Sequence, residues 1–376
     1  MLLATLIHRA SLPCPQVGPD QAVRLLEQHY GLTGTLRSLG SQQDLNYRVD
    51  SDGGRFVLKI CLGDYAAIEL HAQHAALRTL QTQDRLRVPR VIKALTGEDL
   101  LTVTVDGQTL HLRLLDYIDG QPLTHLPHVG REVIAGFGEL CGRMSQALAD
   151  FAHPGLERTL QWDPRHAQEL ISHLLATLPD LPHRAALEQV AEQVGTGIRP
   201  LADHLPWQAV HMDITDDNVV WQRDALRHWQ VQGVIDFGDL AHTWRIADLS
   251  VTCAALLHHA EGDPFAILPA VQACHAVTPL QRAELQALWP LIVARAAVLV
   301  LSSEQQQRLD PDNDYLLKNA EHEWEIFHVA TSVPFELMEA AILCSVGQTL
   351  PPIASEGFAP LLPGLVGREF ALIDLG

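Results

Sequence analysis

The segment VHMDITDDNVVW (210–221) concentrates polar chemistry between two apolar ends. A histidine, three aspartates and an asparagine fall within eight positions, whereas Val210 and the run 219–221 are typical of a buried scaffold. Burying such polar side chains without partners is costly. The segment is therefore either a solvated turn rich in Asp and Asn or a loop that holds a charged group.

Phosphoryl transfer from a nucleotide is one chemistry that uses such a loop. It needs oxygen ligands for a metal ion, a cation for the phosphates and a base for the acceptor hydroxyl. Asp213 and Asn218 can stand at opposite ends of one loop, one facing the acceptor and the other the metal. Asp236, in VIDFGD (234–239), follows a predicted strand. Such hard oxygen ligands suit Mg²⁺.

Lys59 is the matching cation in the first part of the chain. It stands in RFVLKI (55–60) and alternates with Val57 in an otherwise apolar strand. A lysine inside such a strand is unusual unless it meets an anion, although an edge-strand lysine also protects a sheet from aggregation. Glu69, on the predicted helix that follows, is a natural counter-charge.

The composition indicates an acidic globular protein. Of the 376 residues 47% are hydrophobic, so the chain can bury a core in two lobes or domains. The formal charge of −19 repels a phosphate backbone and argues against nucleic acid as a partner. Cationic small molecules and metal-bound phosphates fit this charge better.

The cysteines and the apolar runs indicate a cytoplasmic protein. Six cysteines are scattered without a CxxC pair, as in a reduced core, and we expect no zinc site from them and the histidines. The adjacent His258 and His259 are interpreted as a helix surface. We expect no membrane segment, because the run 289–301 is short and carries Arg295. The apolar start has no charge ahead of it, unlike a signal peptide.

Periodicity divides the chain into a strand-rich part and a mainly helical part. The first part is predicted to hold a helix over 19–34, a hairpin of strands over 46–50 and 55–62, a helix over 64–80, and strands over 99–105 and 111–118. The second is predicted to hold helices over 130–150, 163–178, 183–196, 243–260, 264–275, 279–302 and 313–328, with a β-like segment at 228–239.

These elements predict an α+β fold with a small lobe over 1–118, a larger helical lobe over 119–345 and a linker-like tail over 346–376. The boundary follows from the DGQP turn (119–122) between the last predicted strand and the first long helix. A small ligand would bind where the lobes meet.

HMDITDDN (211–218) followed by IDFGD (235–239) resembles the catalytic and metal loops of the aminoglycoside phosphotransferase and choline kinase family, relatives of protein kinases. QQDLNYRVDSDGGRFVLKI (42–60), RTLQWDPRHA (158–167) and VIDFGDLAHTWRIADLSVTCAALL (234–257) are similar to its hydroxylysine kinase branch. The resemblance implies a protein kinase-like two-lobed fold, with a small antiparallel-sheet N-lobe and a larger helical C-lobe. It also implies Mg²⁺, ATP or GTP as phosphate donor, and an alcohol group as acceptor.

The resemblance assigns roles to the residues of the helical part. Asp213 would be the catalytic base, His211 would support its loop, and Asp248 would brace that loop from a helix. Asn218 and Asp236 would hold Mg²⁺.

In the small lobe, Lys59 would contact the α/β phosphates with Glu69 as its partner. The strand end LLDYI (114–118), with Asp116 and Tyr117, would be the hinge whose backbone meets the purine.

Two positions depart from the family pattern. Met212 stands where the family often has glycine, which we expect to alter the packing of the loop without removing its chemistry. LGSQQDLN (39–46) is no GxGxxG phosphate loop; in the resembled branch an Asp–x–Asn segment takes that place, so Asp44 and Asn46 would face the nucleotide or the substrate.

The acceptor is expected to be an amine-bearing alcohol or a hydroxy amino acid. Trp244 and Arg245 would face it, or else form an ordinary helix start. Asp216 and Asp217 could attract an ammonium group, but solvated loop charge is the interpretation we adopt for them.

Three other functions remain open. These are a catalytically silent kinase-like scaffold, an antibiotic phosphotransferase and a protein kinase. The last is disfavoured, because DFGD leads directly into a predicted helix without an activation segment.

The tail (346–376) is rich in proline and glycine and ends on an apparent strand without a partner. In the resembled branch, kinase units occur fused ahead of peptidase-like and pyridoxal-phosphate aminotransferase-like domains. We therefore hypothesise that this chain is the kinase segment of such a polypeptide.

Overall fold

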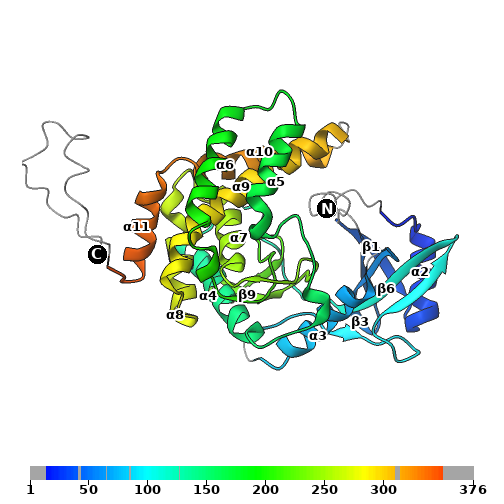
Figure 1. Ribbon diagram of the computed structural model, residues 1–376. Helices are drawn as coiled ribbons and strands as arrows, with labels where there is room; N and C mark the ends of the chain where they lie inside the picture. The colour runs from blue at the N-terminus through cyan, green and yellow to red at the C-terminus, as the bar shows by residue number, and fades with distance from the viewer. Residues whose placement is uncertain are drawn as a thin grey trace, which may run out of the picture.

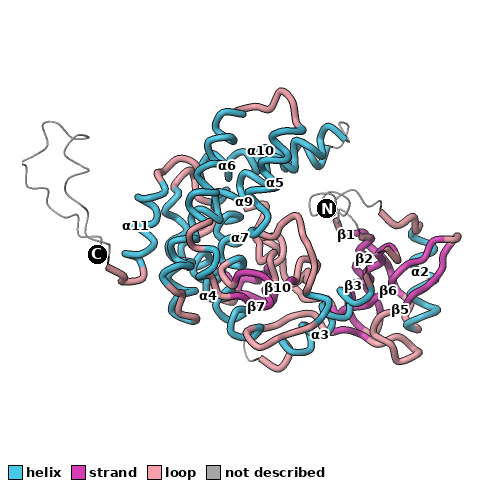
Figure 2. Tube along the Cα trace, viewed as in Figure 1, coloured by secondary structure: helices cyan, strands magenta, loops and turns pink. Residues whose placement is uncertain are grey.

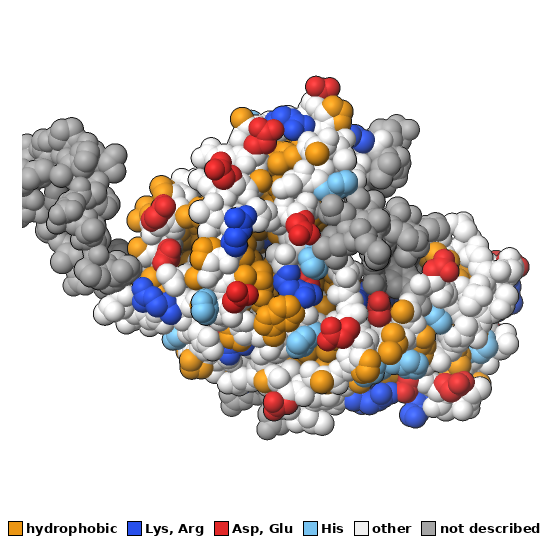
Figure 3. Space-filling view, viewed as in Figure 1, with side chains coloured by type: hydrophobic (Ala, Val, Ile, Leu, Met, Phe, Trp, Pro, Cys, Tyr) orange, Lys and Arg blue, Asp and Glu red, His pale blue; other side chains and the backbone are white. Residues whose placement is uncertain are grey.

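The computed structural model describes residues 14–40, 44–64, 66–83, 86–126, 128–309 and 314–349. Its N-terminal lobe is built on a sheet, and its second lobe is mainly helical (Figure 1). The predicted α+β fold with two lobes is therefore confirmed. On the face shown in Figure 3, acidic and basic side chains of the described residues are interspersed.

The N-terminal lobe holds an antiparallel sheet of six strands in the order β1-β2-β3-β6-β4, with β5 also paired to β6. The predicted hairpin is present, with Asn46 opposite Lys59. The elements of this lobe are α2 (Pro19–Tyr30), β1 (Gly34–Leu39), β2 (Leu45–Ser51), β3 (Gly54–Leu62), α3 (Ala67–Leu80), β4 (Val91–Ile92), β5 (Leu101–Val105) and β6 (Gln108–Asp116).

The first helix is shorter than the predicted 19–34. Gly31 takes φ 66°, a left-handed conformation that costs glycine little and ends a helix there. The three residues thus released lead into β1, a strand that the sequence pattern did not indicate.

The second lobe is organised around α9, which packs against α5, α6, α7, α10 and α11. α9 is long and apolar enough to cross a membrane, but 83% of its apolar window is buried inside the protein, as in a core helix. Helix α11 was not predicted from the sequence. The helices are α4 (Arg131–Leu148), α5 (Ala167–Thr177), α6 (Arg184–Ile198), α7 (Ala247–Leu256), α8 (Leu268–Val277), α9 (Arg282–Leu309), α10 (Asp314–Ala330) and α11 (Phe335–Ser345).

Two strand pairs lie among these helices (Figure 2). β7 (Trp207–Val210) pairs with β10 (Ala241–Trp244), and β8 (Val219–Arg223) pairs with β9 (Trp229–Val234). The helix predicted over 243–260 is therefore wrong at its start: the chain pairs with β7 as far as Trp244 and becomes helical at Ala247. This pairing joins segments distant in sequence, which local periodicity does not report.

The molecule has two large apolar cores. One is formed mainly by α2 and the N-terminal sheet, from Val17 to Leu114, whereas the other fills the second lobe and also includes side chains of α3 together with Leu86, Val88 and Leu115. The predicted boundary at 118–119 lies between the end of β6 and the bridge that joins Gln121 to Trp221, and it stays a prediction. The tail predicted over 346–376 lies outside the described residues beyond 349.

Candidate active site

The β8–β9 hairpin brings two candidate metal ligands together. Val219 pairs with Val234, so Asn218 immediately precedes one strand and Asp236 closely follows the other. The amide of Ile235 donates to the carbonyl of Asn218 at 2.9 Å, which continues this pairing into the loops. The loops 211–218 and 235–240 therefore run side by side.

Asp213 and Asn218 contact each other across the loop that joins them. The Asn218 amide nitrogen donates to Oδ2 of Asp213 at 2.5 Å and to its carbonyl oxygen at 3.1 Å. The amide of Thr215 also donates to that carbonyl oxygen, at 2.9 Å. Because the Asn218 nitrogen is used in this way, its oxygen is directed away from Asp213, and that oxygen is the atom a metal ion needs.

His211 connects the two loops. Its Nδ1 accepts from the amide of Asp213 at 3.2 Å, so Nε2 carries the proton and donates to the carbonyl of Ile235 at 3.1 Å. The ring is fully buried, and burial lowers the pKa of His211 to about 4. A neutral ring in this place fits the predicted supporting role.

Met212 and Asp248 stabilise the bend at the start of the loop. Met212 has φ 64°, a left-handed conformation that explains why glycine is common there, and its side chain is fully buried. The first turn of α7 supplies Asp248, whose Oδ1 accepts from the Met212 amide at 2.6 Å and whose Oδ2 accepts from the His211 amide at 3.4 Å. Burial raises the pKa of Asp248 to about 6.

Asp213 lies in an acidic setting beside one arginine. Its side chain is 28% exposed, and its Oδ1 lies 3.8 Å from Nη2 of Arg295. Burial, followed by the charge of Asp239, raises the pKa of Asp213 well above its usual range, and Arg295 acts in the opposite direction. Added positive charge would therefore favour the ionised form that a base requires.

Lys59 reaches from the N-terminal sheet to the loop after β9. Its Nζ lies 3.2 Å from Oδ2 of Asp236 and 3.3 Å from Oδ1. This ion pair is the main cause that lowers the pKa of Asp236 to about 2, so the carboxylate is ionised. β3 lies between β2 and β6, which excludes the alternative interpretation of an edge-strand lysine.

Glu69 forms an ion pair with Arg158, at 3.1 Å, so its predicted pairing with Lys59 stays a prediction. The Arg158 side chain is only 4% exposed and donates to the carbonyl of Gly238 at 2.8 Å and to that of Leu240 at 3.4 Å. Arg158 therefore links α3 to the loop that follows Asp236. Sequence reasoning missed it, although it opens the segment 158–167 that carried part of the resemblance.

Arg295 is a second residue that sequence reasoning missed. Its guanidinium lies 4.4 Å from the ring centre of Trp162, and its Nη1 is buried without a hydrogen-bond partner in the described part of the chain. Glu323 on α10 interacts with Arg295 and Ser303, and burial raises its pKa to about 7. Arg295 thus places a positive group next to Asp213, and the carboxyl of Glu323 interacts with that positive group.

The predicted hinge has its side chains engaged elsewhere. The Asp116 carboxylate accepts from the backbone amide of Arg90 and from its Nε, the latter at 2.8 Å. The ring of Tyr117 lies 5.0 Å from the guanidinium of Arg48. The amides of Asp116 and Tyr117 donate to the carbonyls of Arg90 and Arg55. A purine would therefore have to use other backbone groups of the segment 114–118.

The loop before β2 is partly described. Asn46 is 8% exposed and lies opposite Lys59, with a buried Oδ1 that has no hydrogen-bond partner among the described residues. Asp44 precedes β2, and residues 41–43 of this predicted loop lie outside the described residues.

Arg245 forms a buried ion pair with Glu284, and Trp244 is buried in β10. The alternative that they face the acceptor is therefore not supported, because the Arg245 guanidinium is already paired with a carboxylate on α9.

A kinase-like fold of two lobes, in which the loops 211–218 and 235–240 lie side by side, is the fold of a class of phosphotransferases. The chain belongs to the phosphotransferase enzyme family, whose family model matches residues 35–287. A hydroxylysine kinase of Danio rerio is 24% identical over 317 residues, which are 81% of this chain and 88% of that protein. The protein is thus an enzyme that transfers phosphate to a hydroxyl group.

Two solved structures share this fold. An amicoumacin kinase in complex with AMP-PNP and Ca²⁺ has a TM-score of 0.64 at 15% identity, covering 85% of this chain and 96% of that one. A microcompartment-associated aminopropanol kinase has a TM-score of 0.62 at 16% identity, covering 88% and 99% of the two chains.

Proposed function

We propose that this enzyme transfers the γ-phosphate of ATP or GTP to the hydroxyl of a small acceptor that carries both an amine and a carboxylate. The observation that carries the proposal is the convergence of Asp213, Asn218, Asp236 and Lys59 on one site. The hydroxylysine kinase and the aminopropanol kinase act on amine-bearing alcohols by name, which supports the acceptor class.

Asn218 and Asp236 fit a Mg²⁺ ion. Asp236 offers an ionised carboxylate, and Asn218 an amide oxygen directed away from Asp213. Two oxygen ligands from the protein suit this ion, which keeps several waters and binds phosphate oxygens. The ion would neutralise charge on the nucleotide phosphates. The amicoumacin kinase was solved with a nucleotide analogue and a divalent cation, which supports such a pair here.

The residues of the chain then have separate tasks. Asp213 accepts the proton of the acceptor hydroxyl as the oxygen attacks the γ-phosphorus. The bond from that phosphorus to the β,γ-bridging oxygen breaks, and the nucleoside diphosphate leaves. Lys59, whose Nζ lies 3.2 Å from Oδ2 of Asp236, would contact the α/β phosphates beside the carboxylate that would hold the metal. His211 and Asp248 position the loop without touching the reacting atoms.

Arg295 and Glu323 favour a hydroxy amino acid over a plain amino alcohol. A guanidinium binds a carboxylate through its planar set of N–H groups, and a buried carboxyl such as Glu323 becomes ionised more easily beside an ammonium group. Arg295 lies beside Asp213, and Glu323 interacts with Arg295.

The test is release of nucleoside diphosphate with Mg²⁺, ATP or GTP, and a panel of hydroxy amino acids and the matching amino alcohols. We expect release that depends on a hydroxy amino acid and is lost in Asp213→Asn. Arg295→Gln should raise KM for hydroxy amino acids far more than for amino alcohols, whereas Arg143→Gln, on the surface of α4, should change neither. Nucleotide binding without turnover on any acceptor would instead favour the silent scaffold.

A further inference from the structure

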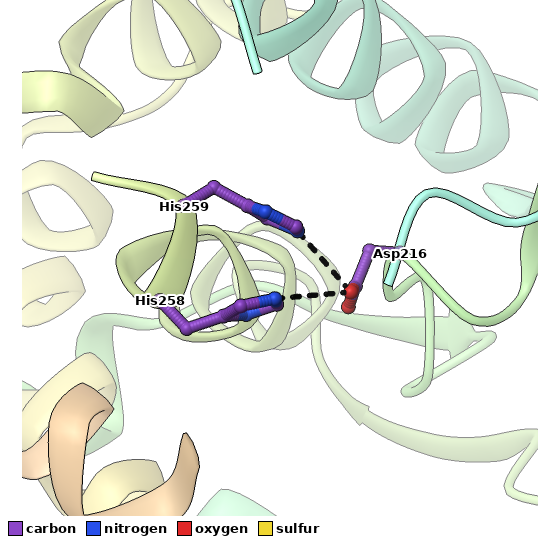
Figure 4. Close-up of side chains that lie close together, drawn as sticks. All are labelled: Asp216, His258 and His259. Atoms are coloured by element: carbon purple, nitrogen blue, oxygen red, sulfur yellow. Dashed lines mark hydrogen bonds and ion pairs between the residues drawn. The ribbon is translucent and has the colours of Figure 1, made fainter. Parts of the chain in front are cut away.

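Asp216, His258 and His259 form a buried cluster behind the catalytic loop (Figure 4). Both histidines belong to the 3₁₀ turn Leu257–His259, which directly follows α7. Asp216 is 4% exposed and His259 0%, and the side chain of His258 is 9% exposed. The expectations of a helix surface for the histidines and of solvated charge for Asp216 are therefore wrong. The segment 123–126 lies against all three and excludes solvent.

The outer nitrogen of each ring is held by a backbone carbonyl. Nδ1 of His258 lies 2.8 Å from the carbonyl oxygen of Ala255, and Nδ1 of His259 lies 2.6 Å from that of Leu126. A carbonyl oxygen only accepts hydrogen bonds, so both Nδ1 atoms carry a proton. A neutral His259 ring therefore has its lone pair on Nε2. Nε2 of His258 lies 3.4 Å from a second carbonyl oxygen, that of Thr124, so a neutral His258 ring would direct its lone pair at oxygen atoms as well. Metal-binding histidines are commonly oriented by such carbonyl groups.

The two Nε2 atoms converge on one oxygen. Oδ2 of Asp216 lies 3.2 Å from Nε2 of His259 and 3.6 Å from Nε2 of His258, as Figure 4 shows. A lone pair that faces a carboxylate is repulsive, and burial removes the screening by water. Positive charge must therefore lie between these atoms. The ring centres are 3.6 Å apart, so protons on both rings would place two charges side by side.

A single proton on one ring leaves the Nε2 lone pair of the other ring facing the carboxylate. A divalent cation would instead bind all three atoms, Nε2 of His258, Nε2 of His259 and Oδ2 of Asp216. Zn²⁺ binds such atoms at about 2.0–2.2 Å, so neighbouring ligands of a tetrahedral ion lie about 3.3 Å apart. The separations of 3.2 and 3.6 Å lie on either side of that value. Two imidazoles with one carboxylate suit zinc and related transition metals better than Mg²⁺.

We propose that Asp216, His258 and His259 form a binding site for a zinc-class divalent cation, distinct from the Mg²⁺ site proposed at Asn218 and Asp236. The ion ties the catalytic loop to the end of α7. Because Asp216 lies between Asp213 and Asn218 in the chain, the ion also fixes the spacing of those two side chains. This site does not depend on which acceptor is phosphorylated.

The test measures metal retained by the full chain. The protein is stripped with a chelator, incubated with Zn²⁺ or Co²⁺ under excess Mg²⁺, desalted, and analysed for metal per chain. We expect about one ion per chain, because three preformed ligands hold it, and a visible Co²⁺ absorption typical of nitrogen ligands. His258→Gln and Asp216→Asn should each weaken binding by at least about 10-fold. Asp217→Asn, its neighbour with the same change of charge, and Asp236→Asn should retain the ion.

Wild-type protein that retains no ion would overturn the proposal and assign the cluster to a histidine–aspartate ion pair. Retention that is unchanged in Asp216→Asn, or lost in Asp236→Asn, would also overturn it. Circular dichroism checks that each variant is folded. If a variant does not fold, the Co²⁺ spectrum of the wild-type protein decides, because thiolate, oxygen and imidazole ligands absorb differently.

Discussion

Asp213 and Asp216 belong to one loop, and they lie in contrasting environments. The Asp213 side chain is 28% exposed and contacts Asn218 and Arg295, groups that suit a reacting centre. The Asp216 side chain is 6% exposed and contacts two imidazoles. The loop thus has an open face that can meet substrate and a buried face that holds it in place. The role of an aspartate in this loop can therefore be inferred only when it is known whether its side chain lies on the open or on the buried face.

The largest expected effect is a loss of kcat on replacing Asp213, on the open face of the loop. Asp213→Asn removes the proposed base and should lower kcat about 10²–10⁴-fold. Stability should hold or rise, because burial and Asp239 already disfavour the charge of Asp213. Steady-state kinetics and urea unfolding measure the two effects. An Asp213→Asn enzyme with more than a tenth of the wild-type kcat would contradict the assigned role.

On the buried face, Asp248→Ala should cost about 3 kcal/mol of unfolding free energy, because it leaves the amides of His211 and Met212 without an acceptor. Asp248→Asn keeps an oxygen for Met212 and removes a charge that burial disfavours, so it should cost much less. The midpoints of urea unfolding distinguish the two. Equal losses in both variants would show that the charge, and not the hydrogen bonds, matters.

His211 predicts how the buried face responds to pH. Its pKa is lowered from 6.5 to about 4 in the folded protein, so the unfolded chain binds the proton more readily between these values. The stabilisation is therefore complete above pH 6.5 and is lost as pH falls through 4. Between pH 7 and 5 this loss should be about 2 kcal/mol.

The control for this prediction is His211→Gln, which lacks the titrating ring but keeps the opposite contribution of Asp248. Unfolding free energies of both proteins at several pH values isolate the effect of His211. A parallel pH dependence in the two proteins would refute the buried neutral ring.

The smallest effect concerns Met212. Both Met212→Ala and Met212→Gly should lose the burial of the side chain. The glycine variant should nevertheless be about 1 kcal/mol more stable than the alanine variant, because glycine tolerates the left-handed backbone at φ 64°. Thermal unfolding of the pair measures this difference. An alanine variant of equal or higher stability would show that the backbone is not strained there.

Sequence patterns predicted the elements that are determined by residues close together in the chain. The hairpin of β2 and β3 follows from alternation around a turn, and the two motif loops followed from residue type and spacing. The end of α2 was misplaced, because Gly31 and Gly34 are both helix-ending residues and only packing decides which one acts. The start of α7 was misplaced because β10 pairs with β7, a contact between segments far apart in the chain.

The sequence by itself determined that Asp213 and Asn218 belong to one polar segment between apolar ends, that Asp236 follows a predicted strand, and that Lys59 stands in an otherwise apolar strand. Only the tertiary structure decided the partners: Asp236 for Lys59, Arg158 for Glu69, and Asp216 for His258 and His259. The physical reason is that residue spacing reports which face of a local element a side chain occupies. The partner of a charged side chain and its burial depend instead on which other elements pack against that face, and residue spacing does not report this.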